Sequence, residues 1–218
     1  MVELFVPYYP PADTGLEIIY TDDHLLVVNK PEGLLAVPGR SADKTDCMAS
    51  RVQRQFPEAR VVHRLDMATS GLMLFARDAD THRKLSQLFS GREITKTYLA
   101  IVSGQVNPAE GDINLPIARD WINRPLQKID YSEGKPSQTL YRTLSFDALN
   151  HQSRLELKPI TGRTHQLRLH LASIGHPILG DTFYKVDIAS RLHLHARSLS
   201  FNHPISQAPL NFICEPLF

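Results

Sequence analysis

The amino-acid sequence predicts an α+β protein with a mixed, mainly antiparallel central sheet and a few flanking helices. Apolar runs of strand length outnumber the segments with helical periodicity. Short connections, such as the turn-forming TDDH at 21–24, imply hairpins and therefore antiparallel pairs. No linker-like stretch divides the 218 residues. We therefore expect an extended amino-terminal tail at 1–14 and one domain at 15–218.

The first strands follow a proline-rich amino terminus, where proline favours extended chain over helix. Apolar and β-branched residues at 16–20 and 25–29 predict two strands joined by that short turn. Pro31 and Gly33 follow the second strand, and both residues typically end regular structure. The amino-terminal part of the domain is therefore expected to begin with a hairpin.

A helix is expected next, because Met48, Val52 and Phe56 recur at intervals of four residues and so share one helix face. Thr45 or Asp46 is a suitable residue to cap it. The other expected elements are a helix at 80–89, a short helix at 164–175 ended by Gly175, and strands at 59–62, 72–77, 97–104, 138–146, 153–158, 197–201 and 210–215. Residues 119–137, rich in Pro, Gly, Asn and charge, predict a long mobile loop, and such loops are often functional.

Composition indicates an ordinary soluble protein, with 42% hydrophobic and 22% charged residues. No apolar run approaches the ~20 residues of a membrane helix, and the first residues lack the features of a signal peptide. The two cysteines, Cys47 and Cys214, are far apart and suit a reducing compartment. We expect a cytoplasmic protein without a membrane partner.

Charge is unevenly distributed along the chain. Residues 1–46 carry three Lys/Arg and eight acids, a balance of −5, whereas the rest carries 21 and 15, a balance of +6. A polyanion could use such a basic surface. Solvated faces of an ordinary protein would account for the same distribution, so charge alone does not decide.

The histidines suggest one metal hypothesis. His193 and His195 are two residues apart, and on a strand both would face the same side and could bind one zinc ion, as in a metal-dependent hydrolase. No H-E-x-x-H motif and no cysteine cluster accompany them. Dinucleotide and Walker-type motifs are absent, and Ser70 lacks the G-x-S-x-G context of a nucleophile. Metal, cofactor and serine chemistry are therefore disfavoured.

Asp66 is the most distinctive residue, a single carboxylate between two apolar runs with His63 and Arg64 just before it. An ionised carboxylate can act as a covalent nucleophile. Burial alone would raise its pKa, and a nearby guanidinium would lower it again. Arg163, in the TGR turn before the short helix, is a candidate partner. A structural salt bridge would use the same two residues, so the residues alone leave both interpretations open.

The same stretches resemble the RluA family of pseudouridine synthases. HRLDMATSGL (63–72), KTYLA (96–100), the long stretch at 157–181 and RLHLHA (191–196) are similar to four family motifs, and VVNKPEGLLAVPG (27–39) is similar to the segment that opens the catalytic domain. These motifs occur in the family's order over nearly the whole chain. Several long co-linear motifs are far more specific than one short pattern.

The resemblance implies an isomerase that converts uridine in RNA to pseudouridine within an RNA-binding cleft of the pseudouridine synthase fold. It implies Asp66 as nucleophile, attacking the ribose or the uracil ring, with Tyr98 against the target base and Arg163 paired with Asp66. Leu194 would contribute to the pocket wall. No metal or redox cofactor is implied. An RNA-binding domain without catalysis is the alternative from another class, and the presence of all three catalytic-type residues speaks against it.

The resemblance also implies that the target base is swung out of its stem-loop. Arg64 is similar to the family arginine that fills the vacated space, and His63 beside it is expected to contact substrate. Only about 25 residues precede the NKP segment, so we expect the short subgroup without an amino-terminal RNA-binding module. That subgroup is associated with stem-loops of tRNA and of large-subunit ribosomal RNA. We expect a monomer, with Arg124 and Lys128 of the 119–137 loop as an RNA clamp or as plain surface.

Overall fold

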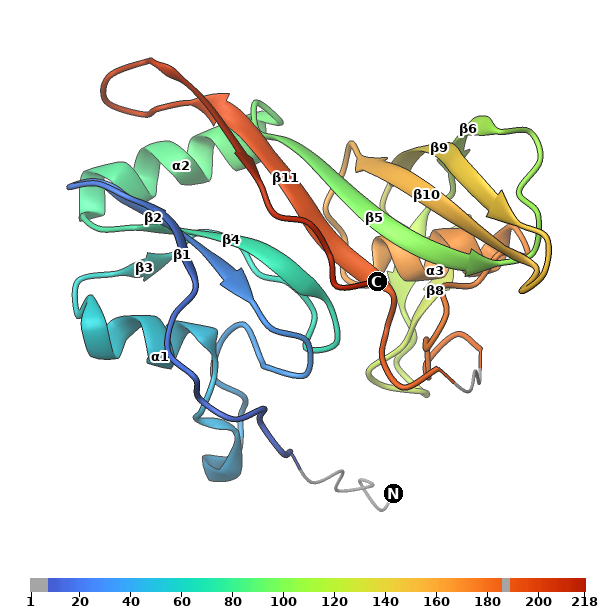
Figure 1. Ribbon diagram of the computed structural model, residues 1–218, viewed down its shortest axis with the longest axis horizontal. Helices are drawn as coiled ribbons and strands as arrows, with labels where there is room; N and C mark the ends of the chain where they lie inside the picture. The colour runs from blue at the N-terminus through green and yellow to red at the C-terminus, as the bar shows by residue number, and fades with distance from the viewer. Residues whose placement is uncertain (1–7, 186–188) are drawn as a thin grey trace.

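A computed structural model describes residues 8–185 and 189–218, and its architecture confirms an α+β fold with a mixed, mainly antiparallel sheet (Figure 1). The helices are α1 (Met48–Gln55), α2 (Ala79–Gly91) and α3 (Gln166–Ser173), with a 3-10 turn at Ala42–Lys44. The strands are β1 (Ile18–Thr21), β2 (Leu25–Lys30), β3 (Arg60–Val61), β4 (Ser70–Ala76), β5 (Thr95–Ser103), β6 (Glu110–Asn114), β7 (Ile117–Arg119), β8 (Gln127–Ile129), β9 (Gln138–Asp147), β10 (Gln152–Pro159), β11 (Leu194–Asn202) and β12 (Pro209–Ile213).

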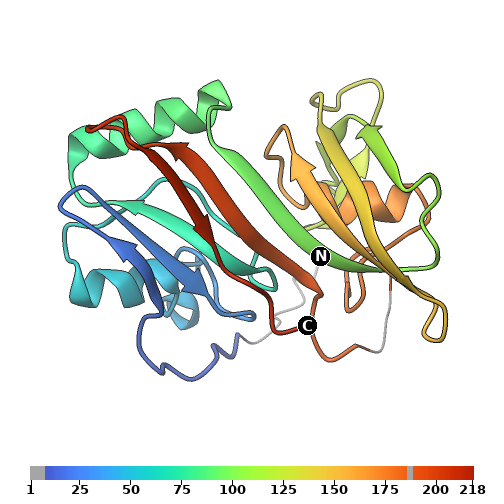
Figure 2. The ribbon, with the colours of Figure 1, turned by 45° about the horizontal axis from the view of Figure 1, so that its top comes forward.

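The main sheet has the strand order β1-β2-β4-β11-β5-β10-β9-β6, with β12 paired to β11 and β3 to β4. Among the described strands, β4 and β11 form the only parallel pair. The long strands β11 and β5 cross the middle of the molecule, with β1, β2 and β4 to one side and β10, β9 and β6 to the other (Figure 2). The centre of the sheet therefore joins segments that lie 125 residues apart in sequence, because His195 pairs with Ser70.

Helices α1 and α2 cover opposite faces of β2 and β4 (Figure 1). Alternate residues of a strand point to opposite faces, and in β2 Leu26 and Val28 pack in the cluster that includes α1, whereas Leu25 and Val27 pack in the cluster that includes α2. All seven residues of β4 are buried. A third apolar cluster lies between α3 and strands β5 and β10.

Gly71 permits the parallel pairing of β4 with β11. Its φ is +113°, and a Cβ atom there would lie 2.4 Å from the carbonyl oxygen of Ala196. Only glycine adopts such a conformation without strain and allows the two backbones to approach this closely. Gly71 thus fixes the position of the Asp66 turn, which lies just before β4, relative to β11.

The structure corrects two expectations. The helix cap is Cys47, not Thr45 or Asp46, and it forms a capping box with Ser50. Residues 119–137 do not form one long loop, because β7 and β8 pair as a two-stranded sheet across this region. The strand β6 and this hairpin are too short for their hydrophobic patterns to stand out in the sequence.

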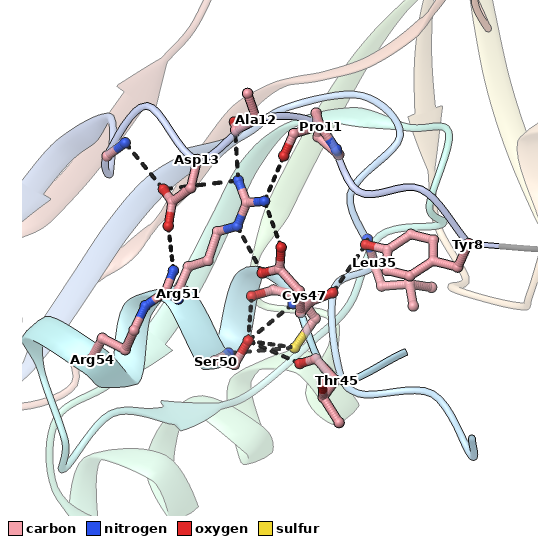
Figure 3. Close-up of polar contacts among 12 residues, drawn as sticks. Tyr8, Pro11, Ala12, Asp13, Leu35, Thr45, Cys47, Ser50, Arg51 and Arg54 are labelled. Carbon is pink, nitrogen blue, oxygen red and sulfur yellow. Dashed lines mark hydrogen bonds and ion pairs between the residues drawn. The ribbon is translucent and has the colours of Figure 1, made fainter. Parts of the chain in front are cut away.

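Arg51 of α1 holds the amino-terminal segment against the domain (Figure 3). Its guanidinium donates to the carbonyl oxygen of Pro11 at 2.6 Å and to both carboxylate oxygens of Asp46 at 2.8 and 2.9 Å. Tyr8 donates its hydroxyl hydrogen to the carbonyl oxygen of Asp46 and accepts a hydrogen bond from the amide of Leu35 (Figure 3). The segment from residue 8 onward is therefore attached to α1.

Candidate active site

Asp66 lies in a cleft of about 680 Å³ formed by the segment before β4, by β5, by α3 with the turn that precedes it, and by the start of β11. Its carbonyl oxygen accepts the amide hydrogen of Thr69 across a tight turn. The carboxylate is 29% exposed, so it is held by the protein yet open to the cleft.

Lys30 holds this turn in place through a hydrogen bond to the carbonyl oxygen of Met67. Its side chain is fully buried at the end of β2 and donates to the carbonyl oxygens of Pro31, Leu34 and Met67 at 2.7–3.0 Å. Burial lowers the pKa of Lys30 to about 7, with Glu32 and Asp66 acting in the opposite direction. Three acceptors match the three hydrogens of an ammonium group. The residue after Asp66 is therefore tied to the NKP segment.

The guanidinium nearest to Asp66 belongs to Arg168, which corrects the expectation for Arg163. The Nη1 atom of Arg168 lies 3.8 Å from Asp66 Oδ2. The exposed side chain of Arg163 lines the same cleft but donates to the carbonyl oxygen of Pro136, and in the described part of the chain Arg163 itself forms no ion pair with Asp66. Arg163 precedes α3 and faces solvent, whereas Arg168 lies within the helix and is buried.

Asp181 holds Arg168 in place through two hydrogen bonds. The Nε and Nη2 atoms of Arg168 donate to the two carboxylate oxygens of Asp181 at 2.8 and 2.7 Å, and both side chains are almost fully buried. This bidentate geometry fixes the guanidinium plane and leaves Nη1 toward Asp66. A sequence signal did exist, because an arginine inside the apolar stretch 167–171 requires a buried acid. Its acid, Asp181, is the last residue of the 157–181 stretch, beyond the end of α3, and no spacing rule pairs the two residues.

His165 is a second group beside Asp66 that the sequence interpretation missed. Its Nε2 atom lies 4.0 Å from Asp66 Oδ2, and its Nδ1 atom lies 3.0 Å from the hydroxyl of Tyr184. The residue precedes α3 with a φ of +53°, in the left-handed region. Such a conformation costs roughly 1–2 kcal/mol in a residue with a side chain and often marks a functional position.

Tyr98 and Leu194 line the cleft together, from the neighbouring strands β5 and β11. Burial raises the pKa of Tyr98, and the negative charge of Asp66 raises it further. The tyrosine therefore stays protonated at neutral pH. Leu194 is 3% exposed and contributes apolar wall.

His63 and Arg64 face the cleft in different ways. The ring of His63 lies 4.7 Å from that of Phe89, and its Nε2 atom accepts the amide hydrogen of Leu74 at 2.9 Å. Burial lowers the pKa of His63 to about 3, so the ring is neutral and supports the wall. Arg64 is exposed at the cleft, and within the described residues its side chain forms no hydrogen bond or ion pair. It is therefore available to a ligand.

Arg124 and Lys128 are not brought to the cleft. Among the described residues that line it, neither appears. The guanidinium of Arg124 lies 4.3 Å from the ring centroid of Trp121, which is 62% exposed, and Lys128 forms an ion pair with Asp130 at 2.8 Å. Both residues belong to the β7–β8 region, outside the set of residues that lines the cleft.

The histidine pair proposed for zinc does not assemble a metal site. Both ring nitrogens of His195 already have protein partners, the hydroxyl of Ser70 and the carbonyl oxygen of Cys214. His193 contacts the carbonyl oxygen of Arg191. Over residues 8–185 and 189–218, no group of three His, Cys, Asp or Glu side chains is arranged to hold a metal ion. Over the same residues, no helix has the length and apolar character needed to cross a membrane.

Comparison with known proteins gives one consistent result. The sequence model of the RNA pseudouridylate synthase family matches residues 24–173. The chain is 50% identical over 201 residues to the dual-specificity RNA pseudouridine synthase RluA of Escherichia coli K12, a match that covers 90% of this chain and 91% of that protein. It is 47% identical over 217 residues to the protein of that name from Pasteurella multocida, with 98% and 99% covered.

Solved structures agree with the sequence matches. The human RNA pseudouridylate synthase domain containing 1 superimposes with a TM-score of 0.78 at 32% identity, covering 95% of this chain and 86% of that chain. Domain containing 4, also human, gives a TM-score of 0.76 at 28% identity, with 92% and 89% covered.

Proposed function

The chain belongs to the RNA pseudouridylate synthase family and is an RNA pseudouridine synthase, an isomerase; from this premise we propose which RNA it modifies and which residues act. We propose that it converts specific uridines in a tRNA anticodon stem-loop, in a large-subunit ribosomal RNA stem-loop, or in both. The name "dual-specificity" carried by its relatives supports two classes of RNA substrate. Cytoplasmic action as a monomer belongs to the same proposal.

Asp66 is the nucleophile of this proposal. The bond between uracil N1 and the ribose breaks, the base turns, and a new bond forms at C5, whose proton is finally lost while N1 gains one. Asp66 attacks either the ribose C1′ or the uracil ring. Tyr98 contacts the base from the cleft wall and assists removal of the C5 proton. The reaction conserves all atoms of the uridine, so it consumes no co-substrate.

The composition of the cleft is the observation that carries the proposal. Asp66 is the only acidic residue among the described residues that line it. Six basic residues surround it: Arg64, Arg92, Lys96, Lys158, Arg163 and Arg168. A single carboxylate within a basic cleft suits a polyanion whose reacting carbon meets that carboxylate, and phosphate contacts supply most of the affinity for nucleic acids.

Base extrusion is part of the proposal, because the Asp66 carboxylate is only 29% exposed. A stacked uracil cannot reach a half-buried carboxylate, and enzymes that act on a base swing it out of the helix at a cost of a few kcal/mol. Arg64 is exposed two residues before Asp66 and is proposed to occupy the space that the base leaves, since a guanidinium stacks on bases and binds phosphate. His63 supports this segment from within. Arg124 and Lys128 are proposed as outer contacts to the stem.

The test compares Asp66→Asn with the wild type on transcripts of the two stem-loops. Pseudouridine formation should fall by roughly 10⁴-fold or more, because the nucleophile is lost, while the Kd for RNA stays within a few-fold. Asp23→Asn is the matched control, because Asp23 is exposed and is not among the residues that line the cleft. Activity retained in Asp66→Asn would refute the proposal. Activity that disappears with excess chelator would instead favour metal-dependent chemistry.

A further inference from the structure

Tyr184 connects the β7–β8 hairpin to the cleft through its hydroxyl group. The amide of Gln127, the first residue of β8, donates a hydrogen bond to the Tyr184 oxygen at 3.1 Å. The same oxygen lies 3.0 Å from Nδ1 of His165. Nε2 of His165 in turn lies 4.0 Å from Oδ2 of Asp66. Four groups from separate segments thus form one chain that ends at the nucleophile.

The positions of the hydrogens in this chain follow from what each group can donate and accept. A backbone amide can only donate, so the Tyr184 oxygen accepts from Gln127. The hydroxyl hydrogen of Tyr184 is assigned to His165 Nδ1 at 3.0 Å, because this gives the hydroxyl an acceptor and leaves a hydrogen on Nε2 toward the Asp66 carboxylate. Burial lowers the pKa of His165, so its ring is neutral at pH 7 and carries one hydrogen. That hydrogen is therefore on Nε2, the atom that faces Asp66.

Neighbouring contacts hold Tyr184 in the required position. One carboxylate oxygen of Asp181 accepts the amide hydrogens of Phe183 and Tyr184 at 2.9 and 3.2 Å. The ring centroids of His165 and Tyr184 lie 5.8 Å apart in an edge arrangement. Asp181 also holds Arg168, so a single buried acid orients both groups that face Asp66.

We propose that Tyr184 is a positioning residue that fixes the Nε2–H form of His165 toward Asp66 and couples the β7–β8 hairpin to the nucleophile. The inference rests on the proposed role of Asp66. With hydrogen on Nε2, His165 presents a positive dipole end to the carboxylate. With hydrogen on Nδ1 it would present a lone pair, which repels the carboxylate. RNA that contacts the hairpin would thereby act on the orientation of Asp66 through the Gln127 amide.

The test is Tyr184→Phe, which removes the hydroxyl and keeps the ring. The kcat is expected to fall about tenfold with KM unchanged, the size expected for one lost uncharged hydrogen bond. Nitrogen-15 NMR of labelled histidine should report the Nε2–H form of His165 in the wild type, and a mixture of both forms in the variant. Tyr20→Phe is the matched control, because it also removes a tyrosine hydroxyl hydrogen bond, to Asp22 at 2.8 Å, away from the cleft.

The outcomes separate this inference from the proposed function. If Tyr184→Phe behaves like Tyr20→Phe in both kcat and the His165 spectrum, the coupling is overturned while Asp66 retains its role. A wild-type spectrum with hydrogen on Nδ1 would overturn the assignment directly. If Asp66→Asn retains activity, the proposed function fails whatever the behaviour of Tyr184.

Discussion

Replacing Arg168 by methionine tests which arginine serves Asp66. The substitution removes the guanidinium and keeps the length and apolar stem of the side chain. Asp181, whose side chain is 1% exposed, is then left as a buried and unpaired carboxylate. Breaking a buried pair in this way costs about 3–5 kcal/mol. At roughly 2–4 °C for each kcal/mol in a chain of this size, Tm should fall by about 6–20 °C.

A second substitution separates stability from catalysis. Asp181→Asn in the Arg168→Met background removes the unpaired charge and retains an oxygen for the amides of Phe183 and Tyr184. The remaining cost is that of imperfectly bonded amide groups, about 1–3 kcal/mol. The free energy of unfolding of the double variant is therefore expected to be roughly 2 kcal/mol higher than that of the single variant.

Activity should not recover with stability. A charge pair at 3.8 Å is worth up to about 4 kcal/mol at an effective dielectric constant of about 20, and solvent at the partly exposed Asp66 reduces this value. We expect kcat to fall about 100-fold, equivalent to about 2.7 kcal/mol, in both variants. The assays are urea unfolding and single-turnover pseudouridine formation at saturating RNA. A double variant with wild-type kcat would refute the role of Arg168.

Two further predictions follow from the cleft wall. Arg163→Ala should change the free energy of unfolding by no more than about 0.5 kcal/mol, because its side chain is exposed. The slope of log Kd for RNA against log salt concentration should fall by about one, the amount expected for one lost phosphate contact. A loss of kcat as large as that of Arg168→Met would contradict this prediction. The pKa of His63 is about 3 when folded and near 6.5 when unfolded, so between these values the unfolded state binds more protons and stability falls as pH falls. Between pH 7 and pH 5 the loss is about 2 kcal/mol, measurable by urea unfolding, and His63→Gln should lack this component; an unchanged pH dependence in His63→Gln would exclude the effect.

Local patterns in the sequence predict most of the architecture but not all contacts of the site. The four-residue repeat at Met48, Val52 and Phe56 predicts α1 correctly, because burial of one face determines that helix. Asp66, Tyr98 and Leu194, which are named from the resemblance, all line one cleft, and their roles in it are proposals. The arginine beside Asp66 is not the expected one, because the 157–181 stretch contains both Arg163 and Arg168, and the contact with Asp181 selects Arg168.

Asp181 illustrates a contact that the sequence alone does not predict. Asp181 lies 13 residues after Arg168, beyond the end of α3, and no periodicity connects them. Tyr184 is similarly joined to Gln127 across 57 residues. Such contacts come from the way the sheet brings separate segments together, and they decide the orientation of side chains that the motifs only identify.

The insertion of β11 between β4 and β5 has a consequence for synthesis on the ribosome. Asp66 precedes β4 and Tyr98 is on β5, yet the strand that lies between these two strands is made about 100 residues after Tyr98. A nascent chain therefore cannot close this part of the sheet until residues 194–202 have left the exit tunnel. The enzyme is therefore expected to become active only when β11 has been made. A ribosome-bound fragment that lacks β11 is expected to contain Asp66 and Tyr98 without the cleft between them.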